Sequence, residues 1–242
     1  AAARRSARPR SCRFVRRDVE GSTVLMSFLR TLQAWLVALL VLASPGTAPA
    51  ADEPVRIVAL GDSLTAGFGI AAQDAFPAKL ERALQAAGHA VRITNAGVSG
   101  DTASGGLARL DWSVPPDTEA VIVELGANDA LRGIDPSVTR KALDDILARL
   151  GRRNIPVLLA GMRAPPNMGE DYARRFDAIY PELAAKHGAL LHPFFLEGVA
   201  AQAGLNQHDG IHPTAEGVDV IVRAILPKAE ELVRRALEKR KP

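Results

Sequence analysis

The sequence predicts an α/β fold, a three-layer αβα sandwich in which helices cover both faces of a five-stranded parallel sheet. Two patterns predict it: short apolar runs rich in Val, Ile and Leu, and longer stretches between them whose apolar residues recur at helical spacing. Strands that alternate with helices pair in parallel through right-handed crossovers. Ligands of such sheets bind beyond the carboxyl ends of the strands, so we look there first for chemistry.

The expected strands are the runs Val55–Leu60, Val91–Thr94, Ala120–Leu125, Val157–Ala160 and Leu190–Pro193. The expected helices cover residues 74–87, 102–110, 136–151, 171–187 and 214–239. No repeat or linker divides residues 51–242, which predicts a single domain there.

Several residues mark the expected helix ends. Asp74 is expected to cap the first helix, which Gly88 ends. Asp135 is expected to cap the third helix, which ends at Gly151. Pro227 lies inside the last helix and is expected to kink or split it, because proline has no N–H to donate and clashes with the preceding turn.

Residues 26–50 resemble a secretory signal peptide. The segment Leu32–Ala43 is an apolar core of 12 residues, and small residues up to Ala50 suit a cleavage site. A membrane span needs roughly 20 apolar residues, so we expect cleavage after Ala50, no stable anchor afterwards, and a periplasmic or secreted protein. An uncleaved N-terminal anchor is the alternative. N-terminal sequencing separates the two, because a cleaved chain starts near Ala51.

The net charge differs between the two parts of the chain. The first fifty residues hold eight arginines against Asp18 and Glu20, a net charge of +6, whereas the whole chain carries +3. Residues 51–242 therefore carry −3, and no basic surface there indicates nucleic-acid binding. Residues 1–25 are an Arg-rich upstream segment that we expect to be unstructured. The only cysteine, Cys12, lies in that segment, so the mature chain would have no disulfide and no thiol nucleophile.

The stretch "IVALGDSLTAGFGI", residues 57–70, begins as a buried strand and then changes to Gly-Asp-Ser. A phosphate loop does not fit, because five residues separate Gly61 from Gly67 and Phe68 stands where a lysine is needed. The hydrolase elbow Gly-x-Ser-x-Gly fails at Thr65. Two interpretations of Ser63 remain open, a nucleophile or an ordinary turn residue, and a base elsewhere would favour the first.

The stretch "HDGIHPTAEG", residues 208–217, places Asp209 and His212 three residues apart, just before the last helix. An aspartate can accept the Nδ1 hydrogen of the imidazole and leave Nε2 free to take a proton from a serine. A capping aspartate beside a surface histidine is the ordinary alternative. A zinc site that includes His208 is a third, although no further histidine or cysteine supports it at a suitable spacing.

Two more polar stretches follow expected strands. In "VIVELGANDALRG", residues 121–133, the amide of Asn128 can donate to a developing negative charge, or it can simply form a turn. In "NAGVSGDT", residues 95–102, Gly97 and Gly100 leave backbone N–H groups uncovered near a helix start.

Taken together, these motifs resemble the SGNH, or GDSL, hydrolase superfamily. They are "GDSL" at 61–64, "NAGVSGDT" at 95–102, "GAND" at 126–129 and "DGIHP" at 209–213, and the resemblance covers nearly all of residues 55–240. Within the superfamily the chain is most similar to the bacterial periplasmic thioesterase, arylesterase and lysophospholipase subgroup, through stretches such as "VELGANDALRG" and "SGDTASGGLARL". The resemblance implies the flavodoxin-like fold of that superfamily.

The resemblance also implies a role for each motif residue. Ser63 would be the nucleophile, His212 the base and Asp209 the group that orients it. The oxyanion hole would consist of the Ser63 and Gly100 N–H groups and the Asn128 side chain. Members of the subgroup often have Asn-Ala-Ser where this chain has Gly97 as the third residue, which should loosen the loop without removing the Gly100 donor.

A groove for the acyl chain is expected beside this site. The stretch "MRAPPNMGEDY", residues 162–172, follows the fourth strand and should overhang the cleft, although a rigid surface loop is equally compatible with it. The residues proposed for the groove are Leu131, Ile134, Pro165, Met168 and Tyr172, with Met162, Pro166 and the "PFFLEG" segment as further candidates.

The expected function is hydrolysis of acyl esters and thioesters through an acyl-serine intermediate, by a monomer that needs no cofactor or metal. A carbohydrate or peptidoglycan O-acetylesterase on the same fold is the alternative enzyme. A binding module with a vestigial site is the alternative from another class. The expected partner is a small acyl substrate.

Overall fold

Five parallel strands form the sheet of residues 53–241, the part of the chain that the computed structural model describes. The strands are β1 (Val55–Gly61), β2 (Val91–Gly97), β3 (Ala120–Glu124), β4 (Val157–Ala160) and β5 (Leu190–His192). Their order is β2-β1-β3-β4-β5, and every neighbouring pair is parallel, which confirms the predicted sheet. The predictions for residues 1–25 and 26–50, with cleavage after Ala50, lie outside the described residues.

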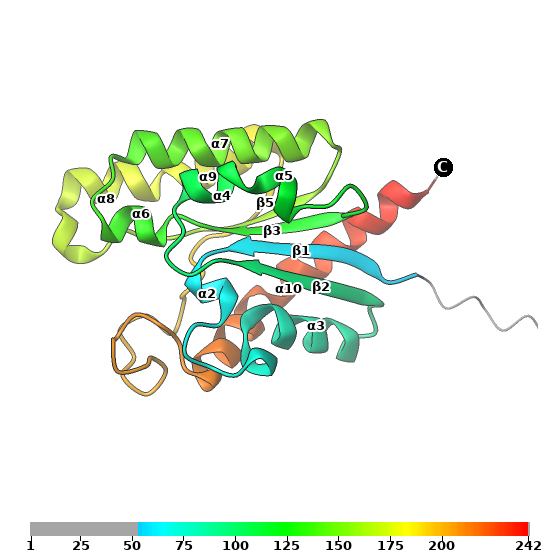
Figure 1. Cartoon of the computed structure of the whole chain (residues 1–242), viewed down its shortest axis with the longest axis horizontal. Coiled ribbons are helices and arrows are strands. Elements are labelled where there is room, and N and C mark those ends of the chain that lie inside the picture. Colours follow the sequence, from blue (N-terminus) through cyan, green and yellow to red (C-terminus); the bar gives the residue numbers. More distant parts are fainter. Residues whose placement is uncertain (1–52, 242) are drawn as a thin grey trace, which may run out of the picture. The chain divides into compact units, whose positions relative to one another are not determined.

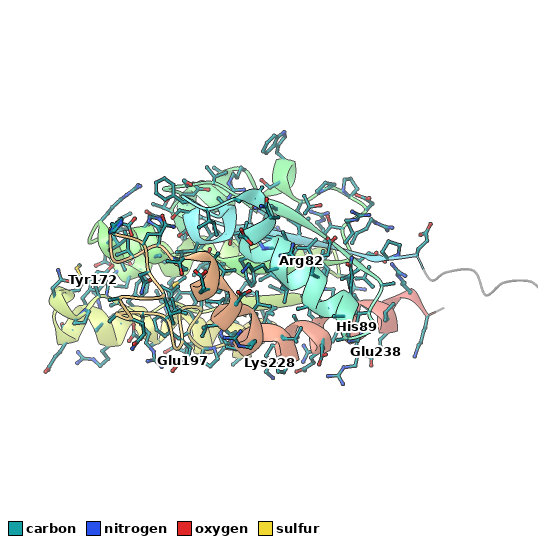
Figure 2. The ribbon with its side chains drawn as sticks, turned by 90° about the horizontal axis from the view of Figure 1, so that it is seen from below. Arg82, His89, Tyr172, Glu197, Lys228 and Glu238 are labelled. Atoms are coloured by element: carbon teal, nitrogen blue, oxygen red, sulfur yellow. The ribbon has the colours of Figure 1, made fainter. Side chains whose placement is uncertain are left out.

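Helices cover both faces of the sheet. The helical segments are α2 (Ser63–Ala66), η1 (Ala72–Asp74), α3 (Phe76–Ala86), α4 (Ala103–Ala108), α5 (Leu110–Ser113), α6 (Ala127–Leu131), α7 (Pro136–Arg152), η2 (Pro166–Met168), α8 (Glu170–Asp177), α9 (Ile179–His187) and α10 (Ala215–Arg240). Figure 1 shows α3 and α10 on one face and α4, α7 and α9 on the other. All residues of β3 are buried, as expected for a strand covered on both sides. On the α3 and α10 side, Arg82 and Lys228 are exposed (Figure 2).

Three expected helix features differ in the structure. Asp74 does not cap α3, because that helix begins at Phe76 and the cap position is occupied by Ala75. Asp74 instead ends η1, with its carboxylate 3.8 Å from the Lys79 ammonium. The expected helix at 171–187 is two helices that meet at Ala178, and the one at 102–110 is likewise two.

Other expected ends are confirmed or shifted slightly. The Asp135 carboxylate accepts the Ser137 N–H at 2.8 Å, so it caps α7 as predicted. That helix runs one residue past Gly151.

Helix α10 continues unbroken through Pro227, because buried residues on both sides of the proline hold it against the sheet. None of the helices in residues 53–241 combines the length and hydropathy needed to cross a membrane.

The sheet order places the end of β1 at a position that favours ligand binding. The chain leaves β1 toward β2 on one side and returns to β3 on the other, so β1 ends at a topological switch point. In the register of the sheet, Gly61 pairs with Gly97 of β2 and with Glu124 of β3. The segments that follow these three residues carry Ser63, Gly100 and Asn128, and the register therefore brings them to one edge.

Candidate active site

Ser63 is the first residue of α2, two positions after the end of β1. The preceding Asp62 caps this short helix, with its carboxylate accepting the Leu64 N–H at 3.0 Å. Position 61 must be glycine, because a Cβ there would lie 2.0 Å from the Thr65 hydroxyl. The first N–H of a helix has no partner within that helix, so the Ser63 N–H is free to face a ligand. Gly-Asp-Ser is thus a strand end, a cap and a helix start.

His212 lies within hydrogen-bond distance of both Ser63 and Asp209. Its Nε2 is 2.9 Å from the Ser63 hydroxyl, and its Nδ1 is 2.6 Å from the Asp209 carboxylate. The other Asp209 oxygen accepts the Ile211 and His212 N–H groups, each at 3.0 Å. These hydrogen bonds from His212 and Ile211 lower the pKa of Asp209 to about 2. An ionised carboxylate only accepts, so Nδ1 carries the ring proton and Nε2 can take one from Ser63.

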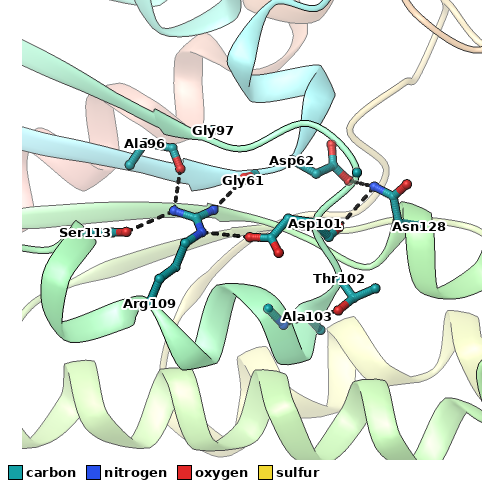
Figure 3. Close-up of polar contacts among 12 residues, drawn as sticks. Gly61, Asp62, Ala96, Gly97, Asp101, Thr102, Ala103, Arg109, Ser113 and Asn128 are labelled. Atoms are coloured by element: carbon teal, nitrogen blue, oxygen red, sulfur yellow. Dashed lines mark hydrogen bonds and ion pairs between the residues drawn. The ribbon is translucent and has the colours of Figure 1, made fainter.

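Asn128 faces the same edge of the sheet from α6. Its amide nitrogen donates to the Asp62 carboxylate at 3.1 Å and to the Asp101 carbonyl at 3.0 Å (Figure 3). These two acceptors show that the amide nitrogen, and not the amide oxygen, faces Asp62 and Asp101. Gly100 directly precedes Asp101 in the segment after β2, and its own carbonyl accepts from Arg132 at 2.6 Å. Within residues 53–241, no cluster of three or more histidine, cysteine or acidic residues is arranged to hold a metal ion.

Comparison with known proteins shows the family of this chain. The model of the GDSL-like lipase/acylhydrolase family matches residues 59–220, about two thirds of the chain. The chain belongs to that family. Esterase TesA of Pseudomonas aeruginosa is 36% identical over 178 residues, which cover 73% of this chain and 89% of that protein. Thioesterase 1/protease 1/lysophospholipase L1 of Escherichia coli K12 is 39% identical over 187 residues, 77% of this chain and 87% of that protein.

Solved structures agree with the family. The crystal structure of AlinE4, a SGNH-hydrolase family esterase, is 52% identical with a TM-score of 0.63, and the match covers 74% of this chain and 96% of that one. The crystal structure of TesA is 35% identical with a TM-score of 0.70, over 73% of this chain and 99% of that one. The flavodoxin-like SGNH fold is therefore confirmed, and this GDSL hydrolase is an ester hydrolase of the SGNH type.

A cavity of about 430 Å³ opens beside Ser63, Asn128 and His212. Its apolar wall comes from α6, from the segment after β4 and from the segment after β5. The apolar side chains in this wall include Leu131, Met162, Pro165, Pro166, Phe194, Leu196 and Ile211. The structure thus places Leu131 and Pro165, and the further candidates Met162 and Pro166, in the lining.

Ile134, Met168 and Tyr172 are not among the residues that line this cavity, and their place in the groove stays a prediction. The Tyr172 hydroxyl donates to the Ile134 carbonyl at 2.8 Å, and its ring stacks on Phe176 with centroids 5.9 Å apart. The end of the Met168 side chain lies against Gly133, 3.5 Å from the position of a Cβ there. The side chains of Tyr172 and Met168 thus have partners outside the cavity, and Ile134 contributes its backbone carbonyl. Their sequence positions, close to residues that do line it, gave no signal of this.

Arg109 is a residue of the site that sequence reasoning missed. Its guanidinium donates to the Asp101 carboxylate at 2.7 Å, to the Ala96 and Gly61 carbonyls at 2.8 and 2.9 Å, and to the Ser113 hydroxyl at 2.9 Å (Figure 3). Arg109 therefore connects the ends of β1 and β2 to Asp101, whose carbonyl accepts a hydrogen bond from Asn128. Its place in the quoted stretch "SGDTASGGLARL" was the only available signal.

Two carboxyl groups are buried beneath Ser63. Glu124 at the end of β3 is fully buried; it accepts the Thr65 hydroxyl at 2.7 Å, and its second oxygen has no partner among the described residues. The pKa of Glu124 is raised well above its usual value. Burial is the main cause, and the nearby Asp62 carboxylate is the second. Burial also raises the pKa of Asp62 to about 6, against the opposing hydrogen bonds from Leu64 and Asn128. At neutral pH, Glu124 is therefore favoured in its neutral form beside an ionised Asp62.

We expect Glu124→Gln to become more stable relative to wild type as pH rises above about 4.5. Because the folded pKa of Glu124 is raised, the folded state keeps a proton that the unfolded chain has lost, and the free energy of unfolding falls as pH rises. Glutamine has the same shape and does not titrate. Urea unfolding at pH 4.5, 6 and 7.5 measures the difference. A difference that is constant across this range contradicts the assignment.

Proposed function

We propose that the protein is a serine esterase that hydrolyses acyl esters and thioesters through an acyl-serine intermediate. Ser63 is the nucleophile, His212 is the general base, and Asp209 orients and stabilises the imidazole. The observation that carries the proposal is the unbroken chain of contacts Ser63–His212–Asp209, at 2.9 and 2.6 Å. Nucleophile, base and orienting carboxylate at these distances are the signature of an activated serine.

In the proposed reaction, His212 Nε2 takes the Ser63 proton as Oγ attacks the acyl carbon. The negative charge that develops on the substrate oxygen is held by the Ser63 and Gly100 N–H groups and by the Asn128 amide, which form the oxyanion hole. The His212 imidazolium then protonates the leaving alcohol or thiol. Water hydrolyses the acyl-serine by the same steps, with His212 again as the base.

The acyl chain binds in the apolar cavity beside Ser63. The names of the relatives, an esterase, an arylesterase and a thioesterase 1/lysophospholipase L1, favour esters and thioesters with a hydrophobic acyl or aryl group. We also propose that the protein is periplasmic or secreted. The signal-like segment in residues 26–50 supports this location.

A panel of p-nitrophenyl esters and acyl-CoA thioesters, from acetyl to dodecanoyl, tests the substrate class. We expect kcat/KM to rise by up to about fourfold for each methylene that enters the cavity, since each is worth about 0.8 kcal/mol. Ala200 lines the cavity, so Ala200→Leu should lower activity on long chains and spare the acetyl ester. Turnover of acetyl esters alone, with acetate released from polysaccharide, indicates an O-acetylesterase instead. Fatty-acid binding without any turnover indicates a binding module.

A further inference from the structure

The pairing of Ser63 with His212 depends on two loops that are far apart in sequence. We call residues 62–71 the serine loop and residues 205–214 the histidine loop. The bond between the Ser63 hydroxyl and His212 Nε2 joins groups 149 positions apart. A single hydrogen bond between side chains does not hold two loops at a fixed separation, so other contacts must do so.

Gln207 supplies such contacts. Its side-chain nitrogen donates to the Phe68 carbonyl of the serine loop at 2.7 Å and to the Pro213 carbonyl of its own loop at 3.0 Å. Its backbone N–H donates to the His212 carbonyl at 2.7 Å. Apart from the Ser63–His212 contact, the Gln207–Phe68 bond is the one hydrogen bond between these two loops that the described residues show. Its side-chain oxygen lies directly over Gly69, where a Cβ would approach to 2.2 Å.

Phe68 transmits this contact to Ser63 and His212. The Phe68 N–H donates to the Ser63 carbonyl at 3.1 Å, so its backbone is one hydrogen bond away from that of Ser63. Its ring lies 4.6 Å from the His212 ring, tilted by 38°. Gln207 therefore links the backbone of Ser63, through Phe68, to the backbone of His212, which its own N–H contacts directly.

We propose that Gln207 is a positioning residue that holds the histidine loop against the serine loop at the distance proton transfer requires. This inference rests on the proposed function, because the distance matters only if His212 deprotonates Ser63. The geometry suits an amide in particular, since one nitrogen supplies two hydrogens to two carbonyl oxygens. Methionine has a similar length and supplies no hydrogen. Glutamate has the same shape and, when ionised, only accepts.

We expect Gln207→Met to lower kcat for an aryl ester by about 10- to 100-fold, because a misplacement of about 1 Å can cost up to 10²-fold. KM should stay within twofold, since Gln207 does not line the cavity. The rate of fluorophosphonate labelling should fall by the same factor as kcat. Gln207→Glu should lose at least as much activity at neutral pH. Relative to wild type it should recover as pH falls, because a protonated carboxyl can donate to Phe68.

Gln202→Met is the matched control, because Gln202 is an exposed glutamine five residues before Gln207 and does not line the cavity. Circular dichroism checks the fold, and Gln207→Glu carries the test if the Met variant does not fold. A kcat within twofold of wild type in both Gln207 variants, or a loss confined to KM, overturns the inference. If the wild-type protein turns over no ester, the proposed function is overturned instead. The positioning role is then tested by NMR. A His212 Nδ1 proton signal that is the same in Gln207→Met as in wild type overturns it.

Discussion

Replacement of Ser63 by alanine is expected to lower kcat for aryl esters by about 10⁴- to 10⁶-fold. Alanine has no hydroxyl to attack the acyl carbon, and within residues 53–241 no other serine hydroxyl lies within hydrogen-bond distance of His212. The fold should survive, because the side chain is small and its loss removes one hydrogen bond. Steady-state kinetics and thermal unfolding of the purified variant measure both effects.

Ser104→Ala is the control for this variant, because Ser104 is an exposed serine of α4 that does not line the cavity. Its activity should match that of wild type. Turnover by Ser63→Ala within tenfold of wild type would mean that another group attacks the substrate.

Asn128→Ala is expected to lower kcat by about 10²- to 10³-fold, the usual cost of losing one oxyanion donor. The effect on KM should be small, because the donor acts on charge that develops only in the transition state. In the structure both amide hydrogens already have acceptors, Asp62 and Asp101. A charged oxyanion must therefore draw one of them away, and this gives Asn128 its largest effect in the transition state.

Asn128→Asp separates the donor from the shape of the side chain. Aspartate fills the same space, supplies no hydrogen and adds a second carboxylate beside Asp62, so its loss of kcat should equal or exceed that of alanine. Retention of wild-type kcat in Asn128→Asp would remove Asn128 from the oxyanion hole. A rise in KM with unchanged kcat would assign it to substrate binding instead.

The strands were predictable because both faces of this sheet are covered. Continuous burial requires continuous apolar runs, and β4, for example, lies where the run Val157–Ala160 placed it. The break between α8 and α9 has a signal in the sequence that the prediction of one helix overlooked. Pro181 has no N–H to donate, and its ring clashes with the carbonyl four residues earlier, at Asp177, where α8 ends. Asp74 misled because α3 begins one residue later than a cap at position 74 requires, with Ala75 in the cap position.

The residues of the site were predictable as motifs, but most of their contacts were not. The local sequence shows that Ser63 and Asn128 follow strands and that His212 precedes a helix. By contrast, the bond from Asn128 to Asp62 joins residues 66 positions apart and follows from the β1–β3 register. The lining of the cavity depends on how the loops fold over it, so the local sequence does not show that Tyr172 lies outside that lining.

The most direct test of the central claim is to trap the acyl-enzyme. Tryptic cleavage after Arg56 and Lys79 gives a peptide of residues 57–79 in which Ser63 is the only serine. After a rapid acid quench with p-nitrophenyl octanoate, mass spectrometry should find an octanoyl group on this peptide in wild type and none in Ser63→Ala. An acyl group on any other peptide during turnover, or the same adduct in Ser63→Ala, would contradict the account.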